Sequence, residues 1–348
     1  MSHNCMMSFS RSRKIVLLLG VLSFVGSCSY SRAKKDVASD LSGHWSESFN
    51  LTPAIDSLGV AELSGLHWNS QKKQLFAVSD NGYLYVLQQG ASGKGFSLTG
   101  SLKKIGNPEG ITTIDEAKNE FYTIDEKHFE IRKYSYSPDF SSYTLMHKWN
   151  LLSDQGGMVD TGNDGPERIE FIPDSYLSAA GFETSDTEEL YTSKKGMGGL
   201  IFIAHQKRGL IWVYDVNPDQ DNDLVLVGRY KTSQRESCDL SFDRSTGLLY
   251  ILHNTDGNFL EVTDLSLKKH GGKRKFNTIA EYPVPNPAGG SANIEGFAIT
   301  PKFDDPKQVS AWFCKDISND ESLEDQKDCL RWFTHIQLDG NRFKNTVK

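Results

Sequence analysis

Five short motifs along the chain each place a polar residue at the start of a predicted strand, and four of these residues are acids. The motifs are ELSGLHW, NPEGITTI, GPERIEFI, SCDLSF and NIEGFAI, with aligned positions Ser64, Glu109, Glu167, Asp239 and Glu295. Carboxylates that converge without a counterion repel one another, and burial raises their pKa values. Oxygen ligands alone suit a hard cation, so the four acids favour Ca²⁺ over Zn²⁺. Without a metal, the same acids would accept hydrogen bonds from the backbone amides of neighbouring units.

The spacing of the motifs predicts the structural units that position these acids. The aligned positions are 45, 58, 72 and 56 residues apart, which is typical of repeated supersecondary units. Three further strands are predicted in each of the first four units, such as QLFAVSD, YLYVLQQ and FSLTGSLKKI in the first. Four antiparallel strands arranged around an axis form a propeller blade. Because the first strand of a blade is innermost, the motif acids are expected to line a central channel.

The sequence therefore predicts an all-β chain with a single β-propeller of five four-stranded blades over residues 43–348. The fifth unit lacks an outer strand, and residues 43–51 (GHWSESFNL) could supply it and close the ring, which removes exposed strand edges. Six blades are the alternative if residues 153–198 contain another unit. Residues 174–198, with the acidic stretch ETSDTEEL, could instead form a flap over one face of the ring.

Polar residues at the ends of the second strands are candidates for the channel mouth. Three units place Asp or Asn fourteen residues after an aligned apolar position, at Asp80, Asp125 and Asn254. His205 and His253 end the second strands of adjacent units and could meet there. Asp and Asn also favour strand ends for reasons of turn chemistry, and the histidines could simply be satisfied core or surface residues, so both interpretations stay open.

The rest of the chain offers little support for nucleophilic catalysis. No G-x-S-x-G, H-E-x-x-H or paired C-x-x-C motif occurs, so a hydrolase would have to use a metal-bound water. The one basic run, KKHGGKRK at 268–275, joins two predicted strands through two glycines. This favours a solvated hairpin loop over a contact with polyanions or lipid headgroups.

The N-terminus has the order of a lipoprotein signal peptide. Three basic residues precede eleven apolar positions at 15–25, which give about 16 Å of helix, too short to span a bilayer. The run ends in VGSC, which resembles a lipobox, so residues 1–27 are predicted to be cleaved and Cys28 to be lipidated. A plain secretory cleavage is the alternative. Residues 28–42 read as a flexible tether. The resemblance to bacterial lipoproteins implies that Ser29 after the lipidated cysteine favours the outer membrane over the inner.

The net charge restricts the class of partner, and the positions of the cysteines predict their oxidation state. Loss of three positive charges with residues 1–27 takes the net charge from −7 to −10, which disfavours nucleic acid as a partner. Cys314 and Cys329 flank an acidic loop between two apolar runs, AWFC and CLRWF, and are predicted to form a disulfide in an oxidising compartment. Cys238 lies in an apolar strand pattern and is predicted to be a buried thiol.

The chain resembles the SdiA-regulated family of propellers and, more distantly, the esterase-like domains of phytase type. The strings that carry this resemblance are LSGLHWNSQKKQLFAVSDNGYLYVL, NPEGITTIDEAKNEFYTIDE, SCDLSFDRSTGLLYILHN and NIEGFAIT. PERIEFIP departs from the family pattern. The resemblance implies an envelope propeller, and its phytase-like side implies calcium and ester or phosphoester hydrolysis. Two functions compete: a lipid-anchored propeller that binds an unknown ligand or envelope protein, and a calcium-dependent hydrolase.

Overall fold

The computed structural model describes residues 45–55, 62–162, 164–254, 257–285, 292–304, 309–317, 322–334 and 336. The chain divides into a unit of Met1–Asp36 and a unit of Val37–Lys348, and the fold described below belongs to the second. The predicted signal peptide, Cys28 and the tether lie outside the described residues. Within the described ranges, no helix is both long enough and apolar enough to cross a membrane.

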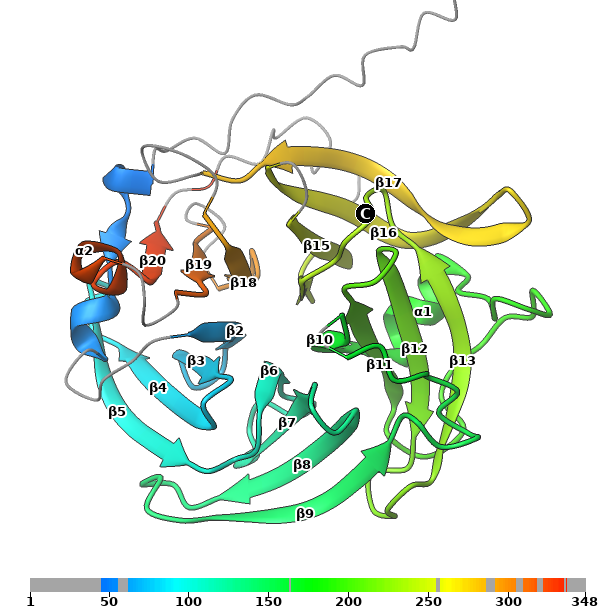
Figure 1. The fold of residues 1–348 in the computed structure, drawn as a ribbon, viewed down its shortest axis with the longest axis horizontal. Helices are drawn as coiled ribbons and strands as arrows, with labels where there is room; N and C mark the ends of the chain where they lie inside the picture. The colour runs from blue at the N-terminus through cyan, green and yellow to red at the C-terminus, as the bar shows by residue number, and fades with distance from the viewer. Residues whose placement is uncertain are drawn as a thin grey trace, which may run out of the picture. The chain divides into compact units, whose positions relative to one another are not determined.

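The strands form three four-stranded antiparallel sheets and one eight-stranded sheet, which consists of two further four-stranded units, so that five blades follow one another (Figure 1). The first blade contains β2 (Leu63–Asn69), β3 (Gln74–Ser79), β4 (Tyr83–Gln89) and β5 (Phe96–Lys103). The second contains β6 (Pro108–Thr112), β7 (Glu120–Asp125), β8 (Glu130–Tyr136) and β9 (Tyr143–Asn150). The third contains β10 (Pro166–Pro173), β11 (Gly199–His205), β12 (Leu210–Val216) and β13 (Leu224–Lys231). The fourth contains β14 (Asp239–Asp243), β15 (Leu248–Asn254), β16 (Asn258–His270) and β17 (Lys273–Pro283). The fifth contains β18 (Ile294–Ile299), β19 (Ala311–Lys315), β20 (Leu330–Phe333) and β1 (Phe49–Asn50).

The inner strands make the closed ring that the repeat predicted. β2, β6, β10, β14 and β18 contact one another in this cyclic order, and β18 contacts β2 again (Figure 1). Apolar clusters fill the spaces between neighbouring blades, for example Phe76 and Val78 of the first blade with Phe121 of the second. The five-bladed all-β propeller is therefore confirmed, with its core arranged as layers between the sheets.

The third and fourth blades are joined at their outer edges. β13 and β17 pair in parallel through Lys231 and Lys275, so the two blades form one eight-stranded sheet. Within residues 153–198, where a sixth blade was the alternative, residues 166–173 form β10 of the third blade, and the described residues after it contain α1 (Asp174–Ala180) and an isolated bridge between Glu183 and Leu190. The helix contacts β10, β11 and β16, so this insertion packs against the third and fourth blades.

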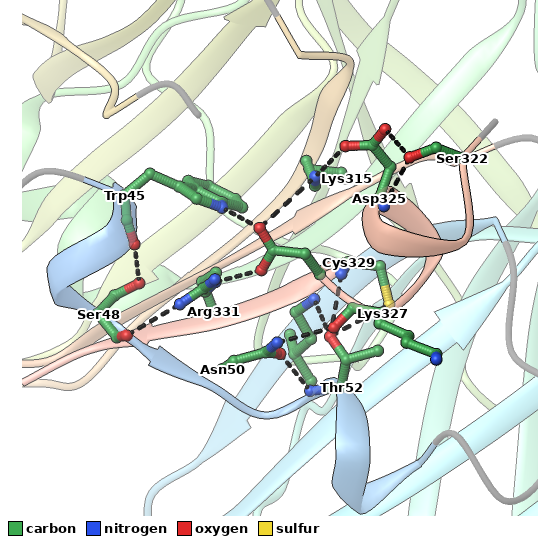
Figure 2. Close-up of polar contacts among 12 residues, drawn as sticks. Trp45, Ser48, Asn50, Thr52, Lys315, Ser322, Asp325, Lys327, Cys329 and Arg331 are labelled. Carbon is green, nitrogen blue, oxygen red and sulfur yellow. Dashed lines mark hydrogen bonds and ion pairs between the residues drawn. The ribbon is translucent and has the colours of Figure 1, made fainter. Parts of the chain in front are cut away.

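The ring is closed by the N-terminal segment, as predicted. Phe49 and Asn50 of β1 pair with Trp332 and Arg331 of β20. Figure 2 shows the polar contacts that hold this joint together. The hydroxyl of Thr52, in a short 3-10 turn (Thr52–Ala54), accepts hydrogen bonds from the backbone amides of Cys329 (2.9 Å) and Leu330 (3.0 Å). In the preceding 3-10 turn (Trp45–Glu47), the Trp45 indole donates a hydrogen bond to an Asp328 oxygen at 2.9 Å. This contact fixes the turn to the last blade.

The disulfide predicted between Cys314 and Cys329 is not formed in the structure. Both are free, buried thiols, and the loop between them carries α2 (Leu323–Gln326). The residue opposite Cys314 in the β19–β20 pairing is Leu330, so the two cysteines are offset by one position in register. The Cys314 thiol faces the carbonyl of Leu63 at 3.3 Å, whereas the Cys329 thiol lies 3.6 Å from the Thr52 hydroxyl. The sequence placed them on adjacent strands correctly but could not fix this offset.

Candidate functional site

Four inner strands share an irregularity one residue after they begin. Their pairing with the second strand of the blade shifts at this point, between Leu63 and Gly65 in the first blade and at the equivalent positions of the second, third and fifth. Bulges of this kind re-aim a side chain and are common beside functional sites. The residues at the four bulges form what we call the upper level of the channel: Ser64, Glu109, Glu167 and Glu295.

The three glutamates of the upper level act on one another electrostatically. Burial raises the pKa of Glu167 well above its ordinary value, and the charges of Glu109 and Glu295 raise it further. Burial also raises the pKa of Glu109, with Glu126 and Glu295 as the strongest charged neighbours. The pKa of Glu295 rises to about 8, through burial and then through Asp316. The structure thus gathers three of the four predicted acids, each half-buried, in one negatively charged environment.

A second set of acids borders the upper level. Asp80, Glu126 and Asp316 each follow the residue that pairs with the first residue of an inner strand. Burial, Glu62 and Asp316 raise the pKa of Asp80 to about 7. The sequence analysis found Asp80 but missed Glu126 and Asp316. A count of fourteen residues from the aligned apolar position of the motif selects Asp125 in the second blade, whereas the strand pairing selects Glu126. The two differ because the hairpin between the first two strands is one residue longer in the second blade than in the first.

The fourth predicted acid, Asp239, does not belong to the upper level. It pairs with Leu252, and this pairing makes it equivalent to Gly65 of the first blade, which pairs with Val78. The residue at the upper level in the fourth blade is therefore Cys238. Its thiol is buried, as predicted, and burial followed by the charge of Glu295 raises its pKa. The alignment of the five motifs placed Asp239 opposite the glutamates because all are acids. This choice shifted the register of the fourth blade by one residue.

Asp239 instead forms a buried ion pair, which we call the lower level of the channel. The Arg168 Nε lies 2.5 Å from an Asp239 oxygen, and both side chains are essentially inaccessible to solvent. Asp239 also accepts hydrogen bonds from the backbone amides of Leu240 and Phe297. Burial raises the Asp239 pKa, and Arg168 and these amides oppose that rise. Three of the other inner strands have glycine at the position equivalent to Asp239. A Cβ atom on one of these glycines, Gly65, would overlap the Arg168 guanidinium.

Further along the inner strands, the polar side chains of the channel are either neutral or have hydrogen-bond partners. His67 Nε2 lies 2.8 Å from the Thr113 hydroxyl, and burial together with the charge of Arg168 lowers the His67 pKa to about 3. Glu170 accepts hydrogen bonds from the Thr112 hydroxyl at 2.9 Å and from its neighbouring backbone amide at 2.8 Å. These contacts follow the alternative considered for the motif acids, in which carboxylates bond to backbone and hydroxyl donors of adjacent blades.

Asp125 and His253, both predicted at the channel mouth, are buried anchors. An Asp125 oxygen lies 2.5 Å from Arg132 Nη1, and the other lies 2.7 Å from His128 Nδ1. His253 Nε2 lies 3.0 Å from a Glu261 oxygen, and its Nδ1 lies 2.6 Å from the backbone carbonyl of Glu236. Both residues precede the mouth position by one residue, so their side chains hold turns in place instead of lining the opening.

His205 and Asn254, the other two predicted mouth residues, also have separate partners. His205 is buried, its Nδ1 accepts a hydrogen bond from the Lys207 amide at 3.2 Å, and its ring stacks on Trp212. The Asn254 amide donates to the side chain of Asn293. The histidines therefore do not form a pair, and of the five predicted mouth residues Asp80 is the one that acts on the glutamates.

The upper level has three carboxylates, the Ser64 hydroxyl and the protonated, buried thiol of Cys238, and its oxygen donors suit a hard cation. In the present side-chain positions, however, the described residues contain no group of three or more His, Cys, Asp or Glu close enough to hold a metal ion. A cation would therefore have to draw the glutamate side chains inward. The geometry provides charge and oxygen atoms near one axis, but not a finished coordination shell.

The fold and the channel define this chain as a β-propeller with an acidic channel mouth. No family model matches the chain, and no curated protein matches it. Hydrazine synthase from Kuenenia stuttgartiensis is similar in structure with 12% identity over 76% of this chain and 58% of that chain, at a TM-score of 0.39. A mitotic checkpoint complex is similar with 9% identity over 78% of this chain and 63% of that chain, at a TM-score of 0.36. The chain spans less than two thirds of either, and at these scores neither likeness carries an argument about function.

Proposed function

We propose that this protein is a binding propeller that takes up a positively charged ligand at the upper level of its channel, with a divalent cation as the first candidate. The observation that carries the proposal is that Glu109, Glu167 and Glu295 occupy equivalent bulges of the inner strands, where neighbouring carboxylates raise the pKa of each. Half-buried acids with carboxylate neighbours are unfavourable without a counterion, so a bound cation would stabilise the folded ring.

Calcium is the first ion to test because its coordination is flexible. It accepts six to eight oxygen ligands at about 2.3–2.6 Å, and water can complete the shell. Asp80, Glu126 and Asp316 border the three glutamates and would add negative charge around such an ion. The lower level would contribute little, because Asp239 is already paired with Arg168.

The experiment is a thermal melt of chelator-treated protein with and without calcium. At a hundredfold excess over Kd, a ligand that binds the native state adds about 2.7 kcal/mol to the free energy of unfolding. We expect calcium to raise the melting temperature of the wild type, and Glu109→Gln with Glu295→Gln to abolish this rise. The matched control, Asp154→Asn with Glu189→Gln, removes two exposed acids elsewhere and should keep the full response. Identical wild-type melts with and without millimolar calcium would contradict a calcium site.

A calcium-dependent hydrolase is the weaker alternative. A phosphoester substrate would need basic side chains beside the cation, and Arg168, the arginine next to Glu167 on β10, is paired with Asp239. Membership of the SdiA-regulated family likewise stays a prediction that the inner-strand motifs support. We therefore favour ligand or partner binding over catalysis.

The proposed location is the cell envelope, with the propeller anchored by lipid on Cys28 and the outer membrane favoured. The support comes from the sequence of basic residues, apolar run and VGSC junction, since Cys28 lies outside the described residues. Cys28→Ala should release the protein from the membrane fraction and abolish labelling with a fatty-acid analogue. Cys238→Ala, which removes a buried thiol of the propeller, is the control and should leave labelling intact. Persistent labelling of Cys28→Ala would contradict the assignment.

A further inference from the structure

A groove on the third blade has the opposite charge to the channel mouth. Its volume is about 510 Å³, within the range of roughly 300–1,000 Å³ that is usual for small-molecule sites. It is lined by parts of β12 and β13, by the turn after β11, by the insertion near Ser185 and by the tip of the β16–β17 hairpin. That tip belongs to the basic run at 268–275, which folds back on the third blade through the pairing of Lys231 with Lys275.

Trp212 lines this groove and has an unused hydrogen-bond donor. Its side chain is 6% exposed, and its buried indole Nε1 has no hydrogen-bond partner among the described residues. A buried donor without an acceptor is costly, so such a group is a reason to expect a ligand or a water. The Arg229 guanidinium lies over the indole ring, 4.9 Å from its centroid.

His205 provides a second donor beside Trp212. Burial, followed by the charge of Lys207, lowers the His205 pKa to about 4, so the ring is neutral at neutral pH. Its Nδ1 accepts the Lys207 amide hydrogen bond at 3.2 Å, which leaves the ring hydrogen on Nε2. His205 also lines the groove, so its ring and the indole of Trp212 stack beside each other at the groove wall.

The charged side chains of the groove are mostly cations. Arg208, Arg229 and Lys273 line it, and none of them has an ion-pair partner within the described part of the chain. Lys207 reaches Asp164 at 3.5 Å, but both side chains are about half exposed. Arg274 is neutralised by Glu183 and Glu188, and Asp186 is the one acid in the lining. This concentration of donors and positive charge stands out in a chain with a net charge of −7.

We propose that this groove is a binding site for a small organic oxyanion, in which a phosphate or carboxylate head meets Arg229 and Lys207 beside Trp212. Guanidinium and ammonium groups are the usual partners of such oxyanions, and the volume of the groove leaves room for the organic part. The site is independent of the cation proposed for the channel, because none of the channel acids lines the groove.

The test is a titration followed by the indole N–H signals of the six tryptophans, with phenyl phosphate, benzoate and benzyl alcohol as probes. Trp212→Phe assigns the Trp212 signal. We expect phenyl phosphate or benzoate to shift that signal and neutral benzyl alcohol to leave it unchanged. A stronger effect of phenyl phosphate identifies a phosphate head, and a stronger effect of benzoate identifies a carboxylate head. Added salt should weaken binding, because the cations are near the surface.

Variants make the test specific to the groove. Arg229→Met should weaken anion binding about tenfold, in line with the loss of one charge-assisted contact. Lys94→Met, which removes an exposed cation of the first blade, is the matched control and should bind as the wild type does. Because Arg229 is exposed, Arg229→Met should fold even if Trp212→Phe does not. In that case, the indole N–H signal that differs most between Arg229→Met and the wild type identifies Trp212. An unchanged Trp212 signal with both anions at millimolar concentration, or equal binding of benzyl alcohol, would overturn the proposal.

Discussion

The central channel contains acids at two levels that are one residue apart on the inner strands. At the lower level, the buried Asp239 has a guanidinium within 2.5 Å. At the upper level, Glu109, Glu167 and Glu295 are half-buried, and their strongest charged neighbours are other carboxylates. The same strands therefore carry one acid that is paired with a cation and three acids that have acidic neighbours.

This difference separates a structural role from a binding role. The ion pair between Asp239 and Arg168 is made within the fold, and Gly65 and Gly110 at the same level provide the space for Arg168. Acids that the fold leaves mutually repelling keep their pKa values high and respond to any cation that arrives. We expect the lower level to determine the stability of the ring and the upper level to determine its response to ligands and pH.

The largest effect should come from breaking the lower level. Arg168→Met would leave Asp239 buried without its cation, and loss of one partner of a buried ion pair costs about 3–5 kcal/mol. The measurement is the free energy of unfolding in denaturant. Arg168→Met combined with Asp239→Asn should recover much of the loss, because the remaining charge is removed. Arg235→Met, at an exposed arginine, should stay within about 0.5 kcal/mol of the wild type. A single Arg168→Met variant as stable as the wild type would show that the pair is dispensable.

The sequence was sufficient to predict the blades because each one repeats the same local pattern. The strands of the first blade coincide with the predicted strings, and Phe49 pairs with Trp332 as the closure required. Alternation of apolar residues and a motif at each inner strand are local signals, and they survive insertions such as α1. The length of the 153–198 segment was ambiguous, because length alone does not distinguish a blade from a helix and a loop.

The site was predicted less accurately because its geometry depends on register. A shift of one residue moved Asp239 from the upper to the lower level, although the equal spacing of Leu66–Asp80 and Leu240–Asn254 points to Cys238 as the counterpart of Ser64. Glu126 and Asp316 had no motif of their own, and strand pairing alone identifies them. The groove beside Trp212 combines segments between Val159 and Arg274 that only the tertiary structure brings together.

The smaller effect, and the sharper test of the upper level, is the pH dependence of stability in chelator-treated protein. Glu295 has a folded-state pKa of about 8 against an ordinary value of 4.5, so the native state holds its proton more tightly than the unfolded chain. Its contribution is fully favourable below pH 4.5 and is lost as the pH rises to about 8. The loss amounts to about 1.4 kcal/mol per pH unit at most.

Glu295→Gln removes this contribution, so the variant should gain stability relative to the wild type as the pH rises from about 5 to 8, and the gain should level off above pH 8. Taking the difference between variant and wild type cancels other titrating groups, including His67 and His205, whose lowered pKa values act in the opposite direction. Asp154→Asn, at an exposed acid, should show no such trend. Calcium should reduce the difference if it binds beside Glu295, because the bound ion favours the ionised carboxylate. A difference that does not change with pH would mean that the folded protein holds the Glu295 proton no more tightly than the unfolded chain, and the upper level would then lose the role proposed for it.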